Sequence, residues 1–109
     1  MRRGDIYVAA SRGAYTGKPR PVVIIQDDRF DATASVTVCP LTTNLLEAPL
    51  TRIEVEPTVS TGIEQPSRMM VDKMMTIPGE NVRGQLGRIS DADVIRLNNA
   101  LIVFLGLAV

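Results

Sequence analysis

The chain has 109 residues and no net formal charge, with 45% hydrophobic and 22% charged residues, a single cysteine and no histidine. This composition is typical of one folded domain over residues 1–109 and argues against disorder over most of the chain. The absence of histidine excludes His-based metal sites and a histidine base, and one cysteine excludes an internal disulfide and CxxC zinc patterns.

Six short segments have the alternating or apolar character of β-strands and are separated by turn-rich connections. They cover residues 5–9, 22–26, 35–41, 52–56, 67–77 and 85–89. Pro40, near the end of the third segment, predicts an edge or a bulge because proline has no N–H to donate. In the segment 67–77, a period of two places Arg68, Met70 and Asp72 on one face.

The C-terminal region predicts a helix that starts after Ser90, a hydroxyl cap followed by acidic residues in the first turn. Its apolar stripe consists of Val94, Leu97, Leu101, Phe104 and Ala108. Beyond Asn99 the helix is apolar all round, which indicates burial in its own domain or against another subunit, and we expect partial burial in a homodimer. Five or six strands closed by one helix predict a small, mostly β barrel.

The second strand begins at Arg20, which lies between Pro19 and Pro21. Proline biases the residue before it to an extended backbone, so the guanidinium projects from a stiff stem. A preset arginine indicates anion recognition, because its donors match phosphate and carboxylate. The alternative is a structural ion pair with a carboxylate such as Asp27.

Positive charge gathers at the N-terminal end, where residues 1–20 hold five cations and one carboxylate. This bias fits an anionic partner, although the zero total charge gives no basic footprint of a duplex-DNA binder. The first residues are not followed by an apolar signal core, and the longest apolar run, 100–109, is too short to span a bilayer. We therefore expect a cytosolic protein without a membrane partner.

Four motifs in order make the chain similar to the MazF/PemK/Kid toxins of bacterial toxin–antitoxin pairs. They are Arg-Gly-Asp-Ile-Tyr at 3–7, Arg-Pro-Val-Val-Ile-Ile at 20–25, Pro-Leu-Thr-Thr at 40–43, and the segment from Asp72 to Ile77 before a single helix. The resemblance covers essentially the whole chain. It implies an SH3-like small barrel of the CcdB/MazF type, closed by the C-terminal helix and assembled as a homodimer.

The resemblance also implies a function. It implies a sequence-specific endoribonuclease that cleaves single-stranded RNA, with mRNA as the expected target, without a metal or another cofactor. The 2′-hydroxyl attacks the adjacent phosphate and leaves a 2′,3′-cyclic phosphate and a 5′-hydroxyl. A MazE-type antitoxin would neutralise the toxin by threading a disordered tail over the active site.

The resemblance carries catalytic roles onto three residues. Arg20 falls on the catalytic arginine, and Thr42 falls on its usual threonine companion, with Thr43 one residue later. Asp72 matches the aspartate of an Arg-x-Asp pair, but Met70 stands at the arginine position. Because arginine is a poor base near pH 7, Asp72 is the candidate for proton removal. As alternatives, Thr42 caps its own turn, and Asp72 pairs with Lys73 or Arg68.

RNA contacts are predicted on the first loop and after the third strand. Cations and polar side chains there suit phosphates and the edges of splayed bases. The predicted RNA-binding residues are Arg12, Tyr15, Lys18, Thr43, Asn44 and Arg68. Arg68 could also replace the missing arginine at position 70 if the backbone brings it round.

Two other functions remain open from the sequence. A gyrase poison of the CcdB type shares the fold, but its C-terminal tryptophan motif is missing at Leu107 to Val109. A barrel that has lost activity and serves as a binding or regulatory module is the other alternative, and Met70 at the arginine position leaves it open. A neighbouring gene for an acidic protein with a disordered C-terminus would favour either toxin.

Overall fold

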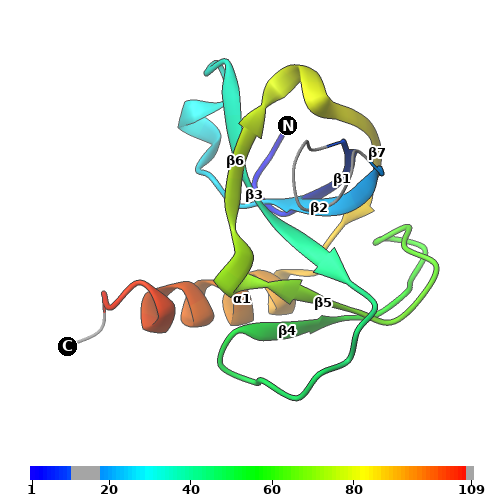
Figure 1. Ribbon diagram of the computed structural model, residues 1–109, viewed down its shortest axis with the longest axis vertical. Helices are drawn as coiled ribbons and strands as arrows, with labels where there is room; N and C mark the ends of the chain where they lie inside the picture. Colours follow the sequence, from blue (N-terminus) through cyan, green and yellow to red (C-terminus); the bar gives the residue numbers. More distant parts are fainter. Residues whose placement is uncertain (11–17, 108–109) are drawn as a thin grey trace.

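The computed structural model describes residues 1–10 and 18–107. Within these residues the chain forms one bent sheet and one α-helix (Figure 1). The strands are β1 (Asp5–Ala9), β2 (Arg20–Ile24), β3 (Ser35–Thr42), β4 (Arg52–Val55), β5 (Ser67–Met70), β6 (Met75–Pro78) and β7 (Val82–Arg88). Three 3-10 turns, η1 (Asp28–Phe30), η2 (Val71–Lys73) and η3 (Gly79–Asn81), precede the helix α1 (Asp91–Phe104). The prediction of a mostly β fold with one C-terminal helix is confirmed.

The seven strands form one antiparallel sheet in the order β4-β5-β3-β2-β1-β7, and β6 pairs with β3 outside this path. β3 holds the sheet together, since it pairs with β2, with β5 at its C-terminal end and with β6 over its N-terminal half. In the described residues no ladder joins β4 to β7. The sheet curls round in Figure 1 but stays open, because closure requires pairing of the outermost strands, so the barrel prediction is met only in part.

The single strand predicted over residues 67–77 is wrong, because the structure divides it into β5, η2 and β6. The ladder with β3 is interrupted opposite Pro40, which has no N–H to donate. The N–H of Val71 instead bonds the carbonyl of Thr51 at 2.9 Å. The irregularity that Pro40 predicts therefore lies in the segment that pairs with β3, at η2. As a result, Asp72 is not on the strand face where an unbroken strand would place it with Arg68 and Met70.

Each face of the sheet carries its own apolar core. The core under α1 contains Val23 of β2 together with Leu97 of the helix, and the core on the opposite face contains Val22 and Ile24. β2 is apolar at successive positions because both of its faces are covered. This covered strand is a rigid support for the residue at its start, Arg20.

The helix begins as predicted, because the Ser90 hydroxyl accepts the N–H of Asp93 at 3.1 Å. Val94, Leu97 and Leu101 pack against the core, but Phe104 is 45% exposed, and Ala108 lies outside the described residues. The buried face includes Ala100 instead, and several apolar side chains at the end of the helix are exposed. These are Ile102, Val103, Phe104, Leu105 and Leu107. None of the described helices is long and apolar enough to cross a bilayer.

The Arg-Gly-Asp opening has a structural role that ties the N-terminus to the sheet. The buried carboxylate of Asp5 accepts the N–H of Arg2 at 2.8 Å and pairs with Arg88 of β7 at 3.1 Å. Arg3 donates its Nε to the carbonyl of Ile25 at 2.8 Å, just beyond β2. These contacts hold β1 between β2 and β7 at the end of the strands that lies away from Arg20.

Candidate active site

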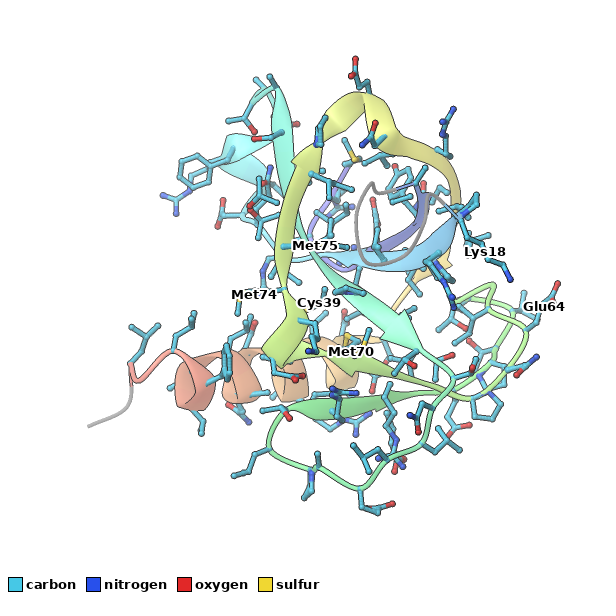
Figure 2. The ribbon with its side chains drawn as sticks, viewed as in Figure 1. Lys18, Cys39, Glu64, Met70, Met74 and Met75 are labelled. Carbon is cyan, nitrogen blue, oxygen red and sulfur yellow. The ribbon has the colours of Figure 1, made fainter. Side chains whose placement is uncertain are left out.

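A hollow of about 210 Å³ opens at the start of β2 and the end of β3. Polar and charged side chains line one part of its wall, and apolar side chains line the rest. The lining residues are Ala9, Lys18, Arg20, Val22, Pro40, Leu41, Thr42, Met70 and Met75. Figure 2 shows Lys18 where the chain enters β2, while Met70 and Met75 come from β5 and β6. The hollow thus joins segments from both halves of the chain.

Strand register brings Arg20 and Thr42 together. β1 pairs with β2 so that Ala9 lies opposite Arg20, and β2 pairs with β3 so that Val22 lies opposite Pro40. When the β2–β3 register is extended by two residues beyond the Val22–Pro40 pair, Arg20 lies opposite Thr42. Directly opposite residues in antiparallel strands project to the same face, so these side chains share one side of the sheet. Two of the three residues predicted as catalytic, Arg20 and Thr42, therefore lie in one hollow.

The hydroxyl of Thr42 caps its own turn, since its Oγ1 accepts the N–H of Asn44 at 3.1 Å. This contact uses a lone pair and leaves the hydroxyl hydrogen available to a ligand. The structural interpretation of Thr42 is therefore correct and is compatible with a role in the site. The hydrogen bond also fixes the oxygen at the rim of the hollow.

The hollow combines two cations with an apolar wall. Lys18 and Arg20 supply the positive charge, and the described lining contains no carboxylate, imidazole or thiol. Such a site suits a phosphate, which guanidinium and ammonium groups both bind, with ribose or base against the apolar wall. Met70 contributes to that wall, so the position where the resemblance implies an arginine presents a thioether.

The carboxylate proposed as Arg20's structural partner is engaged elsewhere. Asp27 accepts both the backbone N–H and the Nε of Arg29, at 2.9 and 3.0 Å. These hydrogen bonds from Arg29 hold the pKa of Asp27 below its usual value. The geometry therefore gives Asp27 a role in the turn after β2, at the opposite end of that strand from Arg20.

Asp72 does not line this hollow. Its two carboxylate oxygens accept hydrogen bonds from Nε and Nη2 of Arg52, at 2.9 and 3.2 Å. Hydrogen bonding to Arg52 lowers the pKa of Asp72, against an opposing effect of burial. Neither Lys73 nor Arg68 is the partner that holds it. The role of general base stays a prediction, and the geometry supports a structural ion pair instead.

Arg68 points to a different hollow, between β4, the preceding loop and α1. The residue is 7% exposed, and its guanidinium lies 3.5 Å from Glu47 and 3.4 Å from Glu54. It therefore does not replace the arginine missing at Met70 in the hollow of Arg20. RNA binding by Arg68 stays a prediction that its burial does not favour.

The remaining predicted RNA contacts divide between two places. Thr43 and Asn44 are exposed directly after β3, and Thr43 also lines a neighbouring hollow. Arg12 and Tyr15 lie outside the described residues. Of the predicted RNA-binding residues, Lys18 therefore lines the same hollow as Arg20, and Thr43 follows Thr42 directly in the chain.

Cys39 is the only thiol in the chain, and it is fully buried next to the hollow. Burial raises the pKa of its thiol to about 12. A thiol in this state is protonated at neutral pH and is a poor nucleophile or metal ligand. Its place in the core under α1 accounts for it fully.

Two parts of the site are missed by the sequence. The first is the wall formed by Met70 and Met75, because methionines in alternating strands are usually core residues. The second is the loop 57–66, which sequence patterns mark only as a connection. The glycine at position 62 is the one sequence signal for this loop. Gly62 adopts a left-handed conformation (φ +68°), and its backbone lies against that of Leu86, where a side chain would not fit.

A family model described as the PemK-like, MazF-like toxin of type II toxin–antitoxin systems matches residues 2–105. The chain belongs to this family. A probable MazF endoribonuclease of Mycolicibacterium smegmatis is 60% identical to this MazF-like chain over 108 residues, 99% of each protein. The MazF endoribonuclease of Staphylococcus saprophyticus is 31% identical and covers 98% of this chain and 92% of its own.

Solved structures agree with this MazF-like fold. The Mycobacterium tuberculosis toxin MazF-mt6 superposes with a TM-score of 0.82 at 26% identity, over 96% of this chain and 99% of that one. A MazE–MazF structure from Deinococcus radiodurans has a TM-score of 0.80 at 16% identity, covering 99% and 97%. At that identity the second likeness concerns the fold alone.

Proposed function

We propose that this MazF-family toxin cleaves single-stranded RNA in the hollow that contains Arg20 and Thr42. Its family and the names of its relatives make the chain an endoribonuclease toxin of a toxin–antitoxin system. The observation that carries the proposal is the meeting of Arg20, Thr42 and Lys18 in one hollow whose other wall is apolar. One toxin domain spans residues 1–109.

The reaction needs no nucleophile from the protein. The ribose 2′-hydroxyl attacks the adjacent phosphorus, the bond to the 5′-oxygen breaks, and the products carry a 2′,3′-cyclic phosphate and a 5′-hydroxyl. The protein has to hold the phosphate in line and stabilise charge on its oxygens. Arg20 supplies a permanent positive charge with two parallel donors, and the Thr42 hydroxyl supplies a neutral donor. This chemistry assigns no step to a metal or another cofactor.

The reaction also requires that the proton of the 2′-hydroxyl be removed. The sequence predicts Asp72 as the base for this step. Because the carboxylate of Asp72 is held in an ion pair with Arg52, solvent water is the better candidate for this role. The segment 11–17, Ser-Arg-Gly-Ala-Tyr-Thr-Gly, contributes no carboxylate either. The proposal therefore rests on phosphate stabilisation by Arg20 and Thr42, which supplies the larger effect in sites of this kind.

Substrate binding is assigned to the cationic rim. Lys18, with Arg12 and Tyr15 of the first loop, would contact phosphates or a base, while Thr43 and Asn44 would read base edges. Readout of base edges requires unpaired, splayed nucleotides, which is why the substrate is single-stranded and the cleavage sequence-specific. Most transcripts offer such stretches, so mRNA is the expected target.

Two protein partners belong to the proposal. A type II toxin of this family implies a cognate antitoxin, which we expect to be of the MazE type. A second copy of the chain is expected on the exposed apolar side chains at the end of α1, such as Val103 and Leu105. Because these partners and the RNA are found in the cytosol, we expect the protein to act there.

Substitution of Arg20 tests the proposal. Arg20→Ala should lower the cleavage rate of a long unstructured RNA by about a hundredfold to a thousandfold, the cost of one lost oxyanion donor. Arg29→Ala is the control, because it removes the same charge from an exposed side chain on η1. Equal activity of the Arg20 variant and the wild-type protein would contradict the assignment of this hollow.

A further inference from the structure

A second hollow, of about 260 Å³, lies beside the Arg20 hollow. Its lining comes from the start of β2, the end of β3, the loop before β5 and strand β7. The lining residues are Pro21, Thr43, Gly62, Ile63, Glu64, Gln65, Ser67 and Leu86. Four segments that are far apart in the sequence therefore meet around it.

The two hollows adjoin through the chain itself. Pro21 follows Arg20 and lines the second hollow, and Thr43 follows Thr42 and does the same. Successive residues of a strand project to opposite faces, so in β2 Arg20 faces the first hollow and Pro21 faces the second. Figure 2 shows Glu64 and Lys18 on the same side of the molecule. A nucleic-acid strand that crosses this edge can place a phosphate at Arg20 and a neighbouring base in the second hollow.

The wall of the second hollow is suited to a base. Ile63, Leu86 and Pro21 offer apolar surface for the faces of a ring. Glu64, Gln65 and Thr43 offer hydrogen-bonding groups for its edge. In the part of the chain that the structure describes, the exposed carboxylate of Glu64 has no ion pair or hydrogen bond to the protein. It can therefore accept hydrogen bonds from a ligand.

The loop that presents Glu64 is held rigidly. The buried hydroxyl of Thr61 donates to the carbonyl of Glu56 at 2.9 Å and accepts the N–H of Thr58 at 2.9 Å. Its neighbour Ser60 accepts the N–H of Arg88 at 2.8 Å, which fastens the loop to β7. A reading group on a fixed backbone discriminates between ligands better than one on a flexible segment.

We propose that this second hollow is the site where the toxin reads one base of its substrate, and that Glu64 selects guanine there. The inference rests on the proposed ribonuclease function and adds the base that it recognises. Guanine presents two adjacent donors on its Watson–Crick edge, N1–H and N2–H, which match the two oxygens of a carboxylate. Adenine and cytosine present a donor beside an acceptor, and uracil presents a donor between two acceptors, so the same carboxylate forms a poorer pair with each.

The experiment first maps 5′ ends after cleavage of a random-sequence RNA. The cut sites of the wild-type protein should share a guanine at one fixed position near the cut. In a defined oligoribonucleotide, replacing this guanine by inosine removes the N2 amine and should lower kcat/KM by about 5- to 150-fold, the range for a good bidentate contact. Glu64→Gln should abolish the difference between the two substrates. Glu56→Gln is the matched control, an exposed carboxylate outside the hollow that should keep it.

A binding measurement separates this inference from the ribonuclease proposal. Strands with 2′-deoxynucleotides cannot be cut, and their affinity for the protein should show the same loss from guanine to inosine, again only with Glu64 present. This result would support the base site even if no RNA were cleaved. Cleavage without a shared guanine, or a Glu64→Gln variant with unchanged preference, would overturn the inference and leave the ribonuclease function intact. If Glu64→Gln kept the preference for guanine but were no longer inhibited by the antitoxin, the hollow would be assigned to binding of the antitoxin instead.

Discussion

Asp72→Asn is the substitution that separates a structural role of this carboxylate from a catalytic one. The pair with Arg52 is largely shielded from solvent, with side chains 13% and 27% exposed for Arg52 and Asp72. Exposed ion pairs contribute about 0–1 kcal/mol, whereas breaking a fully buried pair costs about 3–5 kcal/mol. Two charge-assisted hydrogen bonds in this intermediate setting correspond to a loss of about 2 kcal/mol in the free energy of unfolding.

Thermal unfolding measures this loss. At about 4–8 °C per kcal/mol for a domain of this size, the Tm at pH 7 should fall by roughly 8–16 °C. Asp31→Asn removes the same charge from an exposed position and serves as the control. A double substitution of Arg52 and Asp72 by glutamine and asparagine should recover part of the loss, because it leaves no unpaired charge.

The pH dependence has a definite sign. Because the pKa of Asp72 is lower in the folded protein, the stabilisation is present at neutral pH and is lost as the pH falls through the folded pKa. The difference in Tm between the wild-type protein and Asp72→Asn should therefore shrink below about pH 4, the ordinary range of an aspartate.

Cleavage assays on the same variant complete the comparison. Well below its Tm, Asp72→Asn should cleave RNA within a few-fold of the wild-type rate, whereas loss of a general base costs about a hundredfold to ten-thousandfold. An unchanged Tm together with a large loss of cleavage would refute the structural reasoning and support the general-base prediction.

A substitution at Gly87 and the alkylation of Cys39 test the packing around the site. Gly87→Ala should lower the free energy of unfolding by roughly 1–3 kcal/mol in denaturant titrations, because a Cβ at this position would lie 2.2 Å from the carbonyl oxygen of Ser60. Gly84→Ala on the same strand is the control, and it should change the free energy little, because nothing lies within 4 Å of a Cβ there. Equal effects of the two substitutions would contradict this packing. Cys39 should resist alkylation at pH 8 in the folded protein and react in denaturant, because it is buried and its pKa is raised to about 12; rapid alkylation with loss of cleavage would contradict a purely structural thiol.

Much of the fold follows from local signals in the sequence. Ser90 marks the start of the helix because its cap is a local interaction, and apolar runs mark strands that are covered on both faces. Register is less accessible, because it depends on partners far along the chain. Pro40 predicts a bulge, but only the pairing of β3 with both β5 and β6 shows that the bulge lies at η2 and displaces Asp72.

The site was predictable to a similar extent. Arg20 and Thr42 are indicated by short motifs, and the register of β2 and β3 brings them together as those motifs imply. The partner of Asp72 could not be predicted, because Asp72 lies in η2 and Arg52 lies twenty residues away, at the start of β4. The hollow that includes Glu64 was equally hidden, since it depends on how a glycine-containing loop packs against β7.

The central claim is that the chain cleaves RNA with the substrate's own 2′-hydroxyl as nucleophile. The direct measurement is incubation of the wild-type protein with an RNA oligonucleotide in EDTA, beside the same oligonucleotide with one 2′-deoxynucleotide at the mapped cut. We expect the RNA to be cut to a 2′,3′-cyclic phosphate and a 5′-hydroxyl, and the substituted strand to stay intact. Cleavage of the 2′-deoxy strand, or an intact RNA with folded protein in excess, would contradict it.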